Sequence, residues 1–158
     1  MPDVQGNWQA PSVTLLRRLD HVAVVVRSTD EALRFYRDRL GLRVHSSEEL
    51  DTPRVRLTYL EAGNAYVQLV EPLDPGSPLA DWLEQHGEGL HHICFGVEDV
   101  PAAVAELSDP GSEVVLGSGR GRPSSFVTQR STPVRIECTE FRREEDVDRT
   151  AGWLAPTS

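Results

Sequence analysis

Four polar residues interrupt otherwise apolar, strand-like segments of the sequence, and together they could hold a metal ion. They are His21, Gln68, His92 and Glu137, and they recur at matched positions in two halves of the chain. The two histidines are 71 residues apart, and Gln68 and Glu137 are 69 residues apart. A polar group inside an apolar strand is costly unless it is paired or ligated, so structural core polar groups are the alternative interpretation. Two imidazoles, one amide oxygen and one carboxylate suit Co, Mn, Ni, Fe or Zn, and we therefore predict a divalent metal site.

The elements that must position these residues follow the same order twice. Each half reads strand, helix and three strands, and the near-constant offset predicts two duplicated βαβββ modules. The first helix is expected from the Ser-x-x-Glu capping box at Ser28 to Gly41, which suits the left-handed position after a helix. The strands are expected at 19–27, 42–45, 54–59 and 65–71, and then at 90–97, 113–116, 125–128 and 133–140, with further helices at 79–85 and 101–107.

Composition limits the class of protein. The 158 residues fit one domain, and we expect a flexible leader at 1–17, a domain at 18–141 with modules 18–73 and 88–141, and a tail at 142–158. A net charge of −9 argues against a nucleic-acid surface, and no apolar run reaches the roughly 20 residues of a membrane helix. The start of the chain lacks the pattern of a secretory signal, so a cytoplasmic location is expected. The chain contains no lysine, which excludes Schiff-base chemistry.

Several stretches resemble a known family. The sequence is similar to the vicinal oxygen chelate superfamily of glyoxalases, bleomycin resistance proteins and dioxygenases, and within it to methylmalonyl-CoA epimerases. The resemblance covers residues 18–141. It implies an α+β fold whose curved, cup-shaped mixed sheet surrounds the metal, with the four polar residues as ligands, in a homodimer. The matching stretches are Leu19–Val24, Phe35–Leu42, Gln68–Leu73 and Gly87–Phe95.

One position departs from the epimerase pattern. The resemblance implies two carboxylate bases on opposite sides of the substrate α-carbon, one of them Glu137, but Leu57 occupies the place of the other. Glu137 is then the expected base, with Tyr59 as a candidate acid, and Glu48 and Glu49 are expected in the preceding loop. We expect a metal-dependent isomerase or lyase that removes a proton next to a carbonyl through an enolate. The substrate would be an acyl-CoA or a dicarbonyl metabolite, and one-base isomerisation, cyclisation or elimination is possible. An Fe(II) dioxygenase and a drug-binding resistance protein are the alternatives.

Further residues are expected around the substrate pocket. Leu57 and Cys94 share strand faces with the site, and Arg120 and Arg122 flank a Gly-rich loop that could bind phosphate or carboxylate through forked donors. A solvated hairpin is the alternative for that loop. His91 directly precedes a ligand, and strict strand alternation predicts that it lies on the opposite face of its strand.

Overall fold

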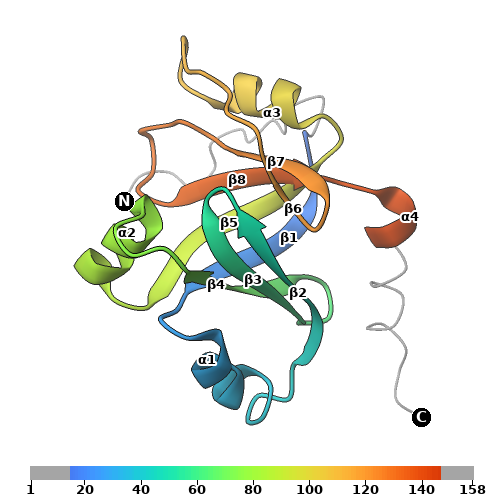
Figure 1. Cartoon of the computed structure of the whole chain (residues 1–158). Helices are drawn as coiled ribbons and strands as arrows, with labels where there is room; N and C mark the ends of the chain where they lie inside the picture. Colours follow the sequence, from blue (N-terminus) through green and yellow to red (C-terminus); the bar gives the residue numbers. More distant parts are fainter. Residues whose placement is uncertain (1–14, 147–158) are drawn as a thin grey trace, which may run out of the picture.

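A single mixed sheet organises the part of the chain that the structure, a computed structural model, describes, which is residues 15–146. Its eight strands lie in the order β2-β3-β4-β1-β5-β8-β7-β6 and curl into a half-barrel (Figure 1). The predicted α+β cup of two βαβββ modules is confirmed. The elements are β1 Leu16–Val25, α1 Thr29–Tyr36, β2 Arg43–Asp51, β3 Arg54–Glu61, β4 Tyr66–Pro72, α2 Pro78–His86, β5 Gly89–Val97, α3 Val100–Leu107, β6 Gly117–Gly119, β7 Arg122–Phe126, β8 Arg135–Glu140 and α4 Arg143–Asp146.

The two modules repeat the same strand order outward from the centre of the sheet. The central strands β1 and β5 are antiparallel, β4 lies parallel beside β1, and β8 lies parallel beside β5. The remaining neighbours are antiparallel hairpins. The first strand of each module therefore meets its equivalent at the middle of the sheet. This arrangement brings the histidines of both modules together.

One helix of each module covers the outer face of the sheet. Helix α1 begins after Ser28, whose hydroxyl accepts the Glu31 amide, and it buries Leu33 against a cluster under β3 and β4. Helix α3 is capped by Asp99 and packs Val100 and Val104 against β7 and β8. Figure 1 shows these two helices at opposite ends of the sheet. Burial of each apolar helix face leaves the concave side of the sheet free to form a site.

Helix α2 covers part of the concave side instead. Leu83 is buried there, and Leu79 and Trp82 pack against an inner cluster that includes Val55 and Val70. Ser77 caps this helix by accepting the Ala80 amide, and Pro78 occupies its first turn, as is common at helix starts. The helix thus forms one wall above the inner face of the first module.

Several predicted boundaries are wrong. Strand β1 begins at Leu16, inside the expected leader, and α1 ends at Tyr36, followed by a turn to Gly41, whose φ is +77°. Residues 113–116 form no strand, and β6 lies in the glycine-rich segment that follows them. The expected tail begins with α4. The rest of the expected leader and tail, residues 1–14 and 147–158, lies outside the described residues. Within residues 15–146, no helix is long and apolar enough to cross a membrane.

Candidate metal centre

Two imidazoles and one carboxylate converge at the floor of the cup. His21 comes from β1, His92 from β5 and Glu137 from β8, and one ligand atom of each lies within 4.8 Å of the others. Glu137 Oε2 is 3.4 Å from His21 Nε2 and 3.1 Å from His92 Nε2. Burial alone would raise the pKa of Glu137, but the two imidazoles beside it lower that pKa well below its usual value.

Three of the four predicted donors fit a cation because they have no hydrogen-bond partner among the described residues. His21 Nε2, His92 Nε2 and Gln68 Oε1 are buried, and none of them has a hydrogen-bond partner among the described residues. The two Nε2 atoms contact Glu137 Oε2 at ion-pair distance. The Gln68 Nε2 group donates to Tyr59 Oη at 2.6 Å, which leaves the amide oxygen as the free end. Buried unpaired polar atoms are costly, and three in one cluster are what a ligated metal would satisfy.

Asp20 orients the first imidazole. Its Oδ1 lies 2.7 Å from His21 Nδ1 and also accepts from Arg120 Nη2 at 2.5 Å. Burial opposes ionisation of Asp20, but these hydrogen bonds and the guanidinium lower its pKa to about 2. An ionised Asp20 accepts from the Nδ1–H group of His21, so that Nε2 is the nitrogen that would bind a cation. Asp20 can reach His21 because it is an extra residue in β1, between the register pairs Leu19–Phe95 and His21–Cys94.

His91 contacts the second imidazole, which corrects its predicted position on the opposite face. His91 Nδ1 lies 2.8 Å from His92 Nδ1, and the two ring centroids are 5.1 Å apart. The strand register explains the error: Ala23 pairs with His92 and Val24 pairs with Leu90, so His91 is an extra residue in β5. A bulge of this kind breaks the strict alternation of a strand and redirects a side chain. Burial lowers the pKa of His91 to about 4, so this imidazole is neutral at pH 7.

A cavity of about 1370 Å³ opens above the four donors. Apolar side chains from the first module, from α2 and from the segment before β6 form much of its wall, while Asp51, Asp81 and Glu113 add acidic groups. The predicted pocket residue Leu57 lies in this wall. The lining also includes His21, Tyr59, Gln68, Trp82, His91, His92, Phe126 and Glu137. The cavity is large enough for a drug-sized or larger molecule above the metal ligands.

The hydroxyl group of Tyr59 is hydrogen-bonded to the side chain of Gln68. Its hydroxyl accepts from Gln68, and a Cβ placed on Gly119 would lie only 2.8 Å from the same oxygen. Burial raises the pKa of Tyr59 well above its usual value, and the Arg120 guanidinium stacks on the ring at 4.6 Å. The phenol therefore stays protonated and fixes the amide of Gln68. Gly119 is required by this close approach.

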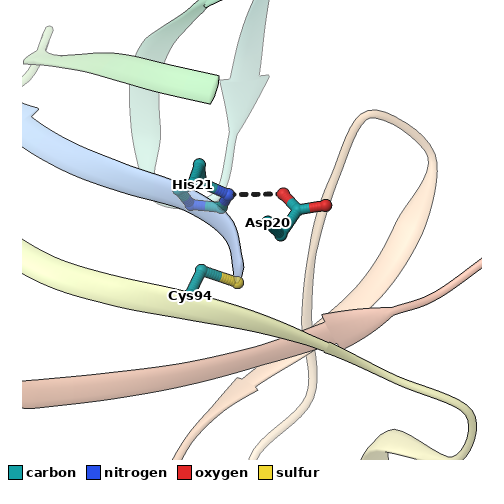
Figure 2. Close-up of side chains that lie close together, drawn as sticks. All are labelled: Asp20, His21 and Cys94. Atoms are coloured by element: carbon teal, nitrogen blue, oxygen red, sulfur yellow. Dashed lines mark hydrogen bonds and ion pairs between the residues drawn. The ribbon is translucent and has the colours of Figure 1, made fainter. Parts of the chain in front are cut away.

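The other three predicted pocket residues do not line the cavity. Cys94 is fully buried, and Figure 2 shows its side chain beside those of Asp20 and His21. Burial raises the pKa of this thiol well above its usual value. Arg120 is held by Asp20, and Arg122 is held by Asp146 at 2.8 Å and by Glu145 at 2.6 Å. Both guanidiniums are neutralised within the protein, which explains why neither reaches the cavity.

The segment around the two arginines is an ordered hairpin, and the expected loop is short. Arg120 and Gly121 have φ values of +54° and +67°, and they form the two-residue turn between β6 and β7. A turn of this kind needs positive φ at both central positions. The Arg120 amide donates to Glu48 Oε1 at 2.6 Å, which links this hairpin to β2 at the other edge of the sheet. Glu48 and Glu49 therefore lie in a strand, where Glu48 pairs with Leu57, and the prediction of a loop is wrong.

Comparisons with known proteins show the family of the chain. The model of the Glyoxalase/Bleomycin resistance protein/Dioxygenase superfamily matches residues 20–140. The chain is 36% identical over 120 residues to the ethylmalonyl-CoA/methylmalonyl-CoA epimerase of Cereibacter sphaeroides, which covers 72% of this chain and 89% of that protein.

Solved epimerase structures share the fold. The methylmalonyl-CoA epimerase of Mycobacterium tuberculosis superposes with a TM-score of 0.72 at 27% identity, over 87% of this chain and 97% of that one. A variant of the Streptomyces coelicolor methylmalonyl-CoA epimerase, in complex with 2-nitronate-propionyl-CoA, gives a TM-score of 0.70 at 31% identity, over 79% of this chain and 97% of that one. The chain belongs to the Glyoxalase/Bleomycin resistance protein/Dioxygenase superfamily, in which its relatives include methylmalonyl-CoA epimerases.

Proposed function

We propose that the protein is a metal-dependent enzyme of the isomerase type that moves a proton on a carbon next to a carbonyl group. The observation that carries the proposal is the set of three buried donor atoms around Glu137, at the floor of the cavity, that make no hydrogen bond to any described residue. The kinship with epimerases supports the same class of reaction. The cation would be Co, Mn, Ni, Fe or Zn, which all accept two imidazoles with oxygen donors.

In this proposal, three residues of the site ligate the cation, and a fourth acts as the general base. His21, Gln68 and His92 would hold the cation through Nε2, Oε1 and Nε2, while Asp20 and Tyr59 keep those atoms turned toward it. A divalent cation at this place would supply Lewis-acid stabilisation of the negative charge that develops on a carbonyl oxygen. The side chain of Glu137 is 12% exposed and lines the cavity, so its carboxylate can reach both the cation and a bound substrate.

Glu137 is the group that we propose to take the proton. A general base must lie within hydrogen-bond reach of the proton that it removes, and the only acid among the four donors is this one. On the opposing wall Leu57 offers no proton acceptor, and its register partner Glu48 is held by the Arg120 amide. The chemistry is therefore of the one-base type. We expect exchange of the substrate α-proton with solvent, with little or no interconversion of the two epimers.

The substrate class follows from the relatives and the cavity together. The relatives are named for methylmalonyl-CoA, and one of their structures contains 2-nitronate-propionyl-CoA. An acyl-CoA thioester, or another compound with two neighbouring carbonyl or carboxyl oxygens, matches a cation with four protein donors and room above it. We propose a homodimer in which each chain carries its own complete site, because both modules of one chain supply the donors.

Proton exchange in heavy water tests the proposal. Methylmalonyl-CoA and a 1,3-dicarbonyl compound are each incubated with the metal-loaded protein, and deuterium at the α-carbon is followed by NMR. The variant Glu137→Gln should slow exchange by a factor of about 100 or more, the scale of a positioned general base. The matched control is Glu113→Gln, which changes another acidic residue of the cavity wall and should leave the rate unchanged. Undiminished exchange in Glu137→Gln would place the base elsewhere, and equal loss in the control would indicate a general effect of cavity charge.

A further inference from the structure

We propose that His91 is a positioning residue for the ligand His92, and that it presents its own Nε2–H group to the cavity as a hydrogen-bond donor. This inference rests on the proposed metal site.

The duplicated modules place a partner for each histidine ligand at the same position. In the first module the residue before the ligand, Asp20, contacts His21 Nδ1 at 2.7 Å, and in the second module His91 contacts His92 Nδ1 at 2.8 Å. Both partners are extra residues in the pairing between β1 and β5, one on each strand. A regular strand would turn each partner to the opposite face of the sheet. Two bulges at equivalent places therefore give each ligand a hydrogen-bond partner from its own strand.

The tautomer of His91 follows from ligation by His92. If His92 Nε2 binds the cation, its remaining proton must be on Nδ1, because a neutral imidazole carries one proton. Among the described residues, the partner of that N–H group is His91 Nδ1, which lies 2.8 Å away. A neutral His91 that accepts on Nδ1 has its own proton on Nε2. His91 lines the cavity, and we assign this second N–H group as a donor to the space that a substrate would fill.

The packing around His91 is suited to holding that orientation. The ring meets Trp82 of α2 edge-on, with centroids 4.9 Å apart, and it meets Phe126 of β7 at 6.3 Å. These contacts restrict rotation of the imidazole. The two partners differ in charge: Asp20 is an anion paired with Arg120, whereas His91 is neutral and lies beside the substrate space. The structure thus gives one ligand a charged partner remote from the substrate and the other ligand a neutral partner next to it.

The direct test is the tautomeric state of the histidines in the protein loaded with Zn²⁺. Long-range ¹H–¹⁵N correlation spectra of ¹⁵N-histidine-labelled protein distinguish a protonated ring nitrogen from an unprotonated or metal-bound one. We expect His92 to carry its proton on Nδ1 and His91 to carry its proton on Nε2. A His91 protonated on Nδ1 would overturn the inference.

Zinc affinity provides a second, independent readout. Replacement His91→Leu removes the acceptor and should weaken Zn²⁺ binding by about 10- to 100-fold, as expected for an outer partner of a ligand. Replacement His91→Gln keeps an acceptor and should restore most of the affinity. The control His86→Ala removes a cavity-lining histidine that stacks on Trp82, and it should leave affinity unchanged.

The outcomes separate the two proposals. Metal-free variants are first compared with wild type by thermal unfolding, so that loss of the fold is not mistaken for loss of a ligand partner. If wild type binds no Zn²⁺, the proposed function is overturned together with this inference. If wild type binds Zn²⁺ and His91→Leu binds it equally well, the positioning role is overturned while the proposed function stands. Failure of His91→Gln to recover affinity above His91→Leu would also contradict a hydrogen-bonding role.

Discussion

Replacing Asp20 by asparagine should expose how much of the fold depends on the charge beneath the site. The Asp20 side chain is 1% exposed, and the Arg120 side chain that it neutralises is 9% exposed. Asp20→Asn keeps the size of the side chain but removes the carboxylate that forms an ion pair with this buried guanidinium. Breaking a buried ion pair on one side costs about 3–5 kcal/mol of the free energy of unfolding.

The lowered pKa of Asp20 gives a second value for the contribution of its charge to the free energy of unfolding. Lowering the pKa from 3.8 to about 2 corresponds to roughly 2 kcal/mol of stability at neutral pH. Because the pKa is lowered on folding, this contribution is present above about pH 4 and is lost as the pH falls toward 2. The two figures agree in order of magnitude. The larger one also includes the unpaired arginine.

The assay is thermal and urea unfolding of metal-free protein at pH 7, followed by circular dichroism. We expect the melting temperature of Asp20→Asn to fall by about 10 °C. The double variant Asp20→Asn with Arg120→Gln removes both charges and should recover a large part of the loss. Its Zn²⁺ affinity should stay low, because an amide is a weaker partner for His21 than a carboxylate. A melting temperature of Asp20→Asn within 2 °C of wild type would refute the reasoning, as would a double variant no more stable than the single one.

Two further predictions concern the donors and the opposing wall. His21→Ala or His92→Ala should abolish tight metal binding and remove the stabilisation by added Zn²⁺, while Gln68→Ala should weaken binding less because the amide is a neutral ligand. Calorimetric titration with Zn²⁺ measures these affinities. Full metal content in both histidine variants would show that the site is misassigned. Leu57→Glu should add the missing second base and allow interconversion of (2R)- and (2S)-methylmalonyl-CoA, which chiral analysis of the product measures. Robust interconversion by the wild-type protein would contradict the one-base interpretation and point to Tyr59 or a glutamate of β2.

The sequence was enough to predict the duplicated fold and the cluster of donors. The matched spacing of two polar positions in two apolar strands depends only on periodicity and repeat length, which a single chain displays directly. The start of the first helix is predictable because Ser28 caps it, whereas Gly41, at positive φ, ends the turn that comes after the helix. The convergence of His21, His92 and Glu137 then follows once the first strands of both modules pair at the centre.

The surroundings of the donors could not be predicted in the same way. Strict alternation placed His91 on the far face, because a bulge depends on how two distant strands pair and leaves no local signal in the sequence. Arg120 and Arg122 lie beside glycines, which suggested a mobile anion-binding loop. Their true partners, Asp20 and Asp146, are distant in sequence and become visible only in three dimensions. Asp20 itself could have been suspected, since it directly precedes a ligand, but only a bulge brings it to the same side.

The repeated strand order also bears on the handedness of substrate binding. The rotation that relates the modules exchanges β4 with β8, and thus exchanges Gln68 with Glu137. If both positions carried the same residue, a chelating molecule could bind in two equivalent orientations. With a neutral amide on one side and an anion on the other, the two orientations differ in energy. A compound with two unlike oxygens would then bind in one orientation. One prochiral face of its central carbon would then be turned toward the carboxylate of Glu137. The difference between Gln68 and Glu137 would thus contribute to stereochemical discrimination in a scaffold whose strand order is symmetric.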